Sequence, residues 1–130
     1  MMKMNFKRHI FDELVQWKTS SNAKPLILRG ARQVGKTTSI RRFAQQNYPY
    51  FLEINFEEKP LLKSIFEGNL DADSIYEKIA VAGLGNLVPH QTLLFLDEIQ
   101  SCPNARTAIK FLVEDGRCDI IESGSLLGIN

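Results

Sequence analysis

The sequence has 130 residues, of which 44% are hydrophobic, 24% charged and 9% aromatic, and its formal net charge is +1. This composition is typical of one soluble globular domain with a sizeable core, and it excludes disordered, collagen-like and disulfide-scaffold chains. The charge is uneven, since residues 1–42 hold ten Lys and Arg against two Asp and Glu, and the remainder holds six against thirteen. We therefore expect an anion-binding site near the start and a cation site or acidic surface later.

The two cysteines and the N-terminus bear on the compartment. Cys102 and Cys118 form no C-x-x-C pattern, which favours a reduced, cytoplasmic setting. The basic N-terminus is not followed by an apolar run, so it does not resemble a signal peptide. No apolar run approaches the ~18 residues that a membrane-spanning helix needs, and membrane insertion is not expected.

Hydrophobic periodicity predicts strands that alternate with helices. An amphipathic helix and a linker are expected within residues 1–22 of a single domain that occupies residues 1–130. Four core strands are expected at 26–29, 50–56, 92–97 and 119–123, and further helices at 36–47, 59–68, 71–85 and 103–116, the third with Asp71 or Asp73 as N-cap. Because the strands are largely apolar, the pattern predicts a parallel sheet covered by helices on both faces.

A glycine-containing loop lies between the first expected strand and the next helix. Residues 30–37, GARQVGKT, satisfy the pattern G-x-x-x-x-G-K-[ST]. The glycines let the backbone wrap closely with its N–H groups inward, and the helix dipole adds positive potential. Lys36 is expected to reach the β- and γ-phosphates, Thr37 to ligate Mg²⁺ and Thr38 to contact the α-phosphate. The expected nucleotide-binding residues are Gly30, Ala31, Arg32, Gln33, Val34, Gly35, Lys36, Thr37 and Thr38.

Two carboxylates follow the third expected strand. Ligands gather at the carboxyl ends of parallel strands, so Asp97 is expected to face the same crevice as Lys36 and to hold the Mg²⁺ shell. Glu98 is a candidate to polarise the water that attacks the γ-phosphate, which points to hydrolysis. A strand end that merely meets solvent is the alternative interpretation of this pair. Ser123 or Ser125, after the last strand, is a candidate sensor hydroxyl, with a polar turn as the alternative.

One tryptophan and a group of arginines each allow two interpretations. Trp17 is a candidate to cover an adenine, although packing of the N-terminal helix is the preferred interpretation. Four arginines near the loop are candidates for a nucleic-acid surface, although the lack of interleaved aromatic residues favours a solvated face. They are Arg29, Arg32, Arg41 and Arg42.

These residues resemble the P-loop ATPases of the additional-strand, catalytic-glutamate division, in the broad AAA+ class. They are most similar to a group of prokaryotic predicted ATPases in which an N-terminal AAA-type domain precedes a C-terminal domain of unknown function. The segments that carry the resemblance are WK at 17–18, KPLILRGARQVGKT, FEEKPLLKSIFEGNLD, TLLFLDEIQSCPNA and SGSLLGI. The resemblance implies ATP or ADP and Mg²⁺ at Gly35, Lys36, Thr37, Asp97 and Glu98, a sheet order of the RecA and AAA+ type, and a C-terminal partner domain or homo-oligomer.

The expected fold is therefore an α/β P-loop NTPase sandwich with four recognisable strands. This is one strand fewer than such a core normally has, and that family continues past the SGSLLG segment, so we expect a core that is incomplete at its C-terminus. Mg²⁺-dependent ATP hydrolysis is the first functional hypothesis. A nucleotide-binding switch with little or no hydrolysis and a small-molecule kinase are the alternatives, and the lack of an N-K-x-D segment disfavours a GTPase.

Overall fold

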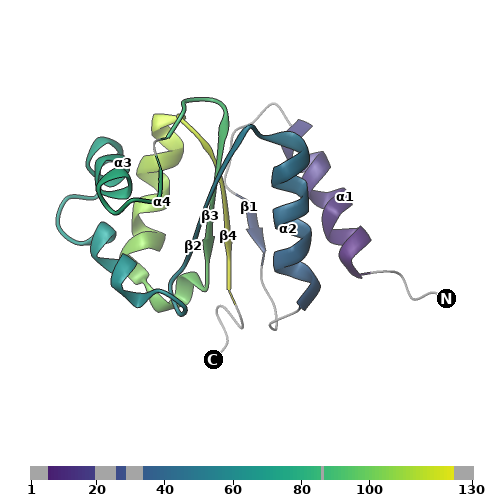
Figure 1. Ribbon diagram of the computed structural model, residues 1–130, viewed down its shortest axis with the longest axis horizontal. Helices are drawn as coiled ribbons and strands as arrows, with labels where there is room; N and C mark the ends of the chain where they lie inside the picture. Colours follow the sequence, from purple (N-terminus) through teal and green to yellow (C-terminus); the bar gives the residue numbers. More distant parts are fainter. Residues whose placement is uncertain (1–5, 20–25, 29–33, 86, 125–130) are drawn as a thin grey trace.

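The computed structural model describes residues 6–19, 26–28, 34–85 and 87–124 of the chain. In this part the chain forms three layers, with a central sheet between two layers of helices (Figure 1). The sheet contains four parallel strands in the order β1-β4-β3-β2. They are β1 (Leu26–Leu28), β2 (Tyr50–Asn55), β3 (Thr92–Asp97) and β4 (Asp119–Ser123). The four strands and their parallel arrangement confirm the expectation from the sequence.

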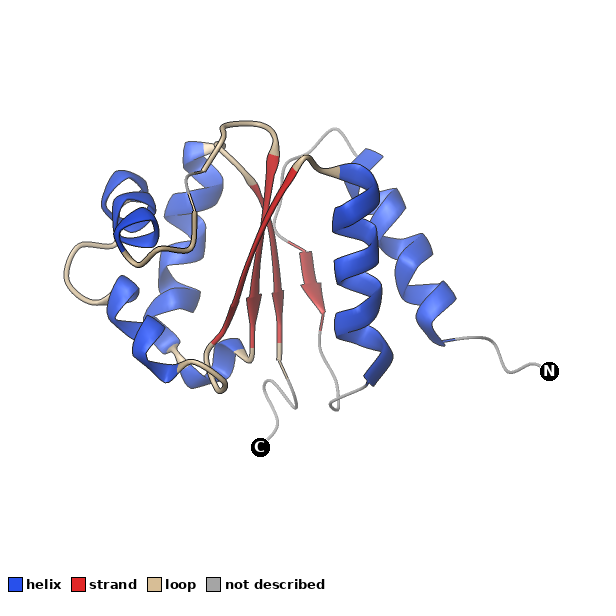
Figure 2. Ribbon diagram, viewed as in Figure 1, coloured by secondary structure: helices blue, strands red, loops and turns tan. Residues whose placement is uncertain are grey.

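Helices cover both faces of the sheet, as Figure 2 shows. One layer contains α1 (Phe6–Thr19) and α2 (Val34–Asn47). The opposite layer contains α3 (Ala72–Val81), α4 (Pro103–Asp115) and the 3₁₀ helices η1 (Pro60–Phe66) and η2 (Ile99–Ser101). The α2 helix begins at the end of the sheet where the strands finish (Figure 2). This is the edge at which parallel α/β proteins bind ligands.

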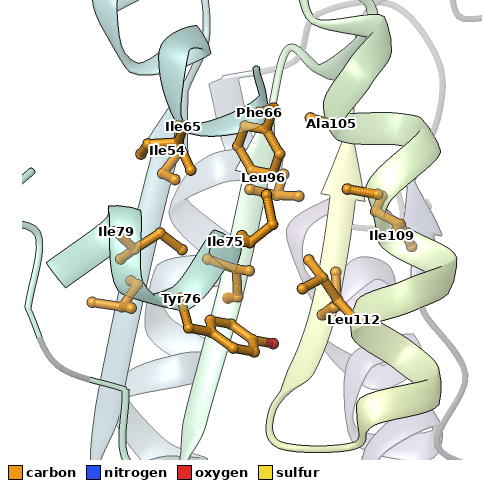
Figure 3. Packing of buried hydrophobic residues seen from close by; sticks show 14 of the residues in the cluster. Ile54, Ile65, Phe66, Ile75, Tyr76, Ile79, Leu96, Ala105, Ile109 and Leu112 are labelled. Carbon is orange, nitrogen blue, oxygen red and sulfur yellow. The ribbon is translucent and has the colours of Figure 1, made fainter. Parts of the chain in front are cut away.

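The apolar strands divide the core into two clusters, because successive side chains of a strand point to opposite faces. The larger cluster lies between the sheet and the layer of α3 and α4, and it includes Leu94, Leu96 and Ile120 (Figure 3). The smaller cluster lies under α1 and α2 and includes Phe95 and Ile121. Alternate residues of β3 and β4 thus belong to the two clusters on opposite faces of the sheet. The alternation also shows which face each residue at the strand ends lies on.

Local signals explain most element boundaries. The α3 helix is capped by Asp71 and not by Asp73, since the Asp71 carboxylate accepts from the backbone N–H of Ser74 at 3.1 Å. The α4 helix has Pro103 in its first turn and ends at Asp115, followed by Gly116 as its C-cap, whose φ of 79° belongs to the left-handed region that glycine tolerates.

One expected helix differs in type. Residues 59–68 were expected to form an ordinary helix, but the structure has the 3₁₀ helix η1 at Pro60–Phe66. Its ends are tied by short-range bonds, from Leu62 N–H to Lys59 O at 3.0 Å and from Glu67 N–H to Ser64 O at 3.2 Å. A helix of seven residues can form only a few of the i→i−4 hydrogen bonds of an α-helix. The i→i−3 bonds of a 3₁₀ helix therefore cost little by comparison.

Candidate functional site

Three polar side chains form a row at the carboxyl ends of adjacent strands. In the register of the sheet, Asn55 of β2 pairs with Asp97 of β3, and Asp97 pairs with Ser123 of β4. Phe95 and Ile121, two residues earlier, belong to the core beneath α1 and α2. Because strand side chains alternate with period two, Asp97 and Ser123 face the same layer of helices. The row therefore lies on the face where α2 begins.

Lys36 lies at the start of α2, the helix that begins at this edge of the sheet (Figure 2). It is the third residue of the helix, and the residue as a whole is only 5% exposed. Its positive charge acts on the Asp97 carboxyl and lowers the pKa of that group, although burial has the larger and opposite effect. The structure thus places the lysine and the aspartate at the same edge of the sheet, both buried.

The Asp97 carboxyl is held in an environment that disfavours its charge. Burial is the largest cause of its raised pKa, and the neighbouring Glu98 carboxylate adds to the effect. The backbone N–H of Glu98, which donates to Asp97 Oδ1 at 2.9 Å, acts in the opposite direction. A group that stabilises negative charge, such as a cation, would relieve this cost.

Glu98 is buried and has a backbone conformation that is unusual for a residue with a side chain. Its φ of 54° and ψ of 48° lie in the left-handed region, which costs a non-glycine residue about 1 kcal/mol or more. Contacts on both sides hold it, because its N–H donates to Asp97 and its carbonyl accepts from Ser101 N–H at 3.0 Å. Gln100 Nε2 donates to Glu98 Oε1 at 2.8 Å. Non-glycine residues in strained conformations cluster at functional sites.

Ser123 is the last residue of β4 and is fully buried. Within the described residues, its hydroxyl oxygen has no hydrogen-bond partner. A buried hydroxyl without a partner costs free energy, so such groups in native proteins call for an explanation, and a ligand is one. Ser125, the other candidate, lies outside the described residues.

The remaining predicted binding residues are placed only in part. Gly30, Ala31, Arg32 and Gln33 lie outside the described residues. Val34 and Gly35 form the first backbone positions of α2. Thr37 is half-buried and Thr38 is exposed in the first turns of the same helix.

Asn55 belongs to the row but was not a candidate from the sequence. Its Oδ1 accepts from the backbone N–H groups of Glu57 at 2.9 Å and Glu58 at 3.0 Å. These bonds orient the amide so that Nδ2 points at Asp97 Oδ2, at 3.5 Å. The available signal was its position as the polar residue that ends a strand, but the pairing with Asp97 depends on a register that the sequence does not state.

Two other sequence candidates have structural roles. Trp17 lies against Phe43, with ring centroids 6.4 Å apart, so it packs on the core of the helical layer. Arg41 forms a two-bond ion pair with Glu53, from Nε at 2.9 Å and from Nη2 at 2.8 Å.

Both cysteines are buried free thiols, and burial raises the pKa of Cys118 to about 11. None of the described helices has both the length and the apolar character needed to span a bilayer.

Comparisons with known proteins identify the family and the fold of the chain. A family model described as "AAA domain" matches residues 22–129. The structure of C. elegans PCH-2 aligns with 100% of this chain at a TM-score of 0.55 and 15% sequence identity. That similarity concerns the fold, and this chain covers only 39% of the PCH-2 chain. No curated protein matches the chain in sequence.

The family match spans most of the chain and includes every residue of the row at the strand ends. The fold, with a parallel sheet whose carboxyl edge meets the start of α2, is the one that the family resemblance implied. The chain belongs to the AAA domain family, and it is a nucleotide-binding domain of that family.

Proposed function

We propose that this domain binds ATP together with Mg²⁺ at the carboxyl edge of the sheet and hydrolyses it to ADP and phosphate. The observation that carries the proposal is that a buried lysine, Lys36, and two buried carboxylates, Asp97 and Glu98, lie at this edge. A buried charge costs free energy, and a nearby opposite charge offsets part of that cost. A nucleoside triphosphate with a divalent cation supplies an anion for the lysine and a cation for the carboxylates.

The phosphates are proposed to bind at the start of α2. The first backbone N–H groups of a helix have no partner inside it, and the helix dipole adds positive potential there. Lys36 adds a full charge in the first turn. The role of the loop residues before the helix remains a prediction from the G-x-x-x-x-G-K-[ST] pattern.

Mg²⁺ is proposed to be held by the Thr37 hydroxyl and the Asp97 carboxylate. Both are oxygen donors, which Mg²⁺ prefers, and it commonly keeps water ligands while it bridges one or two protein groups and phosphates. The raised pKa of the buried Asp97 carboxyl supports the fit, because a cation would stabilise the charged form. The bound ion would neutralise charge that develops on the phosphates.

Glu98 is proposed to act as the general base for hydrolysis. Its carboxylate accepts a proton from water while the water oxygen forms the new bond to the γ-phosphorus. The bond between this phosphorus and the oxygen that bridges it to the β-phosphate breaks, and ADP leaves with that oxygen. Lys36 and the first turn of α2 hold the phosphates in place during this step.

The proposal is tested by measuring the rate of phosphate release from ATP in the presence of Mg²⁺, for the chain and for its Glu98→Gln variant. The variant is expected to lose turnover by at least about 100-fold while it still binds ATP, since an amide cannot accept the proton. Glu114→Gln, at an exposed position of α4, removes the same charge away from the site and should leave turnover unchanged.

The outcomes separate the candidate functions. Unchanged turnover in Glu98→Gln would exclude Glu98 as the base. ATP binding without phosphate release above the buffer rate would instead support the nucleotide-binding switch. Transfer of labelled phosphate to an added acceptor, with no free phosphate, would support the kinase.

A further inference from the structure

The short helix η2 follows Glu98 directly and carries a side chain that reaches back to it. Gln100 is exposed as a residue, yet its Nε2 lies 2.8 Å from Glu98 Oε1. An ionised carboxylate only accepts hydrogen bonds, so the amide nitrogen of Gln100 is the group that faces it. The contact therefore has a fixed direction, from Gln100 to Glu98.

The backbone around Gln100 is fixed on both sides. Ile99 is fully buried and belongs to the larger core cluster. Ser101 N–H donates to Glu98 O at 3.0 Å, and Ser101 Oγ donates to Glu57 Oε2 at 3.4 Å. With its neighbours anchored, Gln100 can hold the Glu98 carboxylate in one orientation at a modest entropic cost.

Orientation matters at Glu98 because its backbone is left-handed, with φ 54°. The residue stands between the end of β3 and the start of η2, where the chain changes direction. A carboxylate has about four lone-pair directions, so the bond from Gln100 leaves it able to accept a further proton. The Gln100 bond thus contributes to the orientation of the carboxylate and leaves lone pairs for a water molecule.

We propose that Gln100 is a positioning residue for hydrolysis, which orients the Glu98 carboxylate toward the attacking water through the bond from Nε2 to Oε1. The inference rests on the proposed function, in which Glu98 is the base. It predicts that a hydrogen-bond donor at position 100 is what turnover requires, and that the size of the side chain matters less.

Three substitutions separate the donor from the size of the side chain. Gln100→Lys retains a donor, Gln100→Met has a similar length without a donor, and Gln100→Glu has nearly the same shape but repels Glu98. We expect kcat to fall less than about threefold in Gln100→Lys, about tenfold in Gln100→Met and further in Gln100→Glu, with KM for ATP within about twofold of the wild type. Gln46→Glu, an exposed change on α2, serves as the charge control and should have no effect.

Steady-state kinetics of the full chain with Mg²⁺ and ATP distinguish the outcomes. Circular dichroism verifies that each variant is folded. A wild-type kcat in Gln100→Met, or equal losses of kcat in all three variants, would overturn the role of the donor. The proposed function would still stand if Glu98→Gln had lost turnover. A wild-type chain that releases no phosphate would overturn both. If Gln100→Glu fails to fold, the comparison between Gln100→Lys and Gln100→Met decides the question alone.

Discussion

Asn55 donates its side-chain amide to Asp97 across two strands that are adjacent in the sheet but 42 positions apart in the chain. The bond from Nδ2 to Oδ2 is long, at 3.5 Å. The orientation of the amide does not depend on this bond alone, because Oδ1 accepts two backbone N–H groups from the turn after β2. Asn55 therefore joins the turn after β2 to the carboxylate at the end of β3.

Asn55→Asp should destabilise the domain in a pH-dependent manner. The new carboxylate can keep both backbone bonds, but it places a second negative charge beside Asp97. Mutual repulsion adds to the burial that already raises the folded-state pKa of Asp97, so stability is lost as pH rises from the unfolded pKa through the folded pKa of Asp97. We expect the free energy of unfolding to fall by about 1–3 kcal/mol at pH 7 and by less at pH 4.

Urea denaturation at the two pH values measures this difference. Asn69→Asp, an exposed substitution with the same formal charge, provides the control and should show little pH dependence relative to the wild type. Equal losses at both pH values would mean that Asn55 contributes shape or backbone bonding, and not electrostatics.

Asp97→Asn should stabilise the domain in the absence of nucleotide and metal, although it removes a proposed Mg²⁺ ligand. Burial raises the pKa of the Asp97 carboxyl, so the folded state binds protons more readily than the unfolded state. Stability of the wild type therefore falls as pH rises from the unfolded pKa through the higher folded pKa. Above that interval the variant avoids the cost of a buried charge.

Thermal unfolding in EDTA at pH 4 and pH 8 tests this prediction. The variant should melt at a higher temperature than the wild type at pH 8, and the gap should shrink at pH 4. Added Mg²⁺ and ATP should reverse the order by stabilising the wild type, since a ligand that binds only the folded state shifts the equilibrium. A variant that is less stable at pH 8 without ligand would mean that the attraction between Lys36 and Asp97 outweighs burial.

The sequence predicts the regular elements well because each element has its own local signal. The apolar run of β3 ends at Asp97, and α4 begins at Pro103 and ends before Gly116, as the sequence indicated. The common edge for Lys36 and Asp97 was also predictable, since it follows from the parallel sheet and the strand–loop–helix order.

The contacts within the site were not predictable in the same way. The bond from Asn55 to Asp97 depends on the register of β2 against β3, and periodicity alone does not define register. The bond from Gln100 to Glu98 depends on the left-handed backbone at Glu98, which no propensity favours for glutamate. Both features are set by tertiary packing.

Arg41→Ala should lower the free energy of unfolding by at most about 1 kcal/mol, despite its two short bonds to Glu53. The Arg41 side chain is 56% exposed, so solvent screens the pair and the arginine loses side-chain entropy when it is held. The loss should shrink further in about 1 M NaCl. Urea denaturation with and without the added salt measures both losses. Arg42→Ala, at the exposed neighbouring position, is the control. A loss that persists in high salt would indicate packing by the arginine stem.

Ser123→Ala should separate stability from catalysis at the end of β4. Because the Ser123 hydroxyl is buried without a partner among the described residues, its removal should leave the nucleotide-free domain equally stable or more stable by about 1 kcal/mol. If the hydroxyl contacts the γ-phosphate, the same change should lower kcat by about tenfold.

Ser64→Ala is the matched control, because that hydroxyl donates to Leu61 O at 3.0 Å on the surface and lies in η1 on the other side of the sheet. Ser125→Ala tests the other candidate hydroxyl. Denaturation and phosphate release, measured on the same samples, decide between the two serines. A slower Ser125→Ala beside an unchanged Ser123→Ala would assign the sensor role to Ser125. A destabilised Ser123→Ala with normal kcat would make the Ser123 hydroxyl structural, because the cost would then appear without any nucleotide bound.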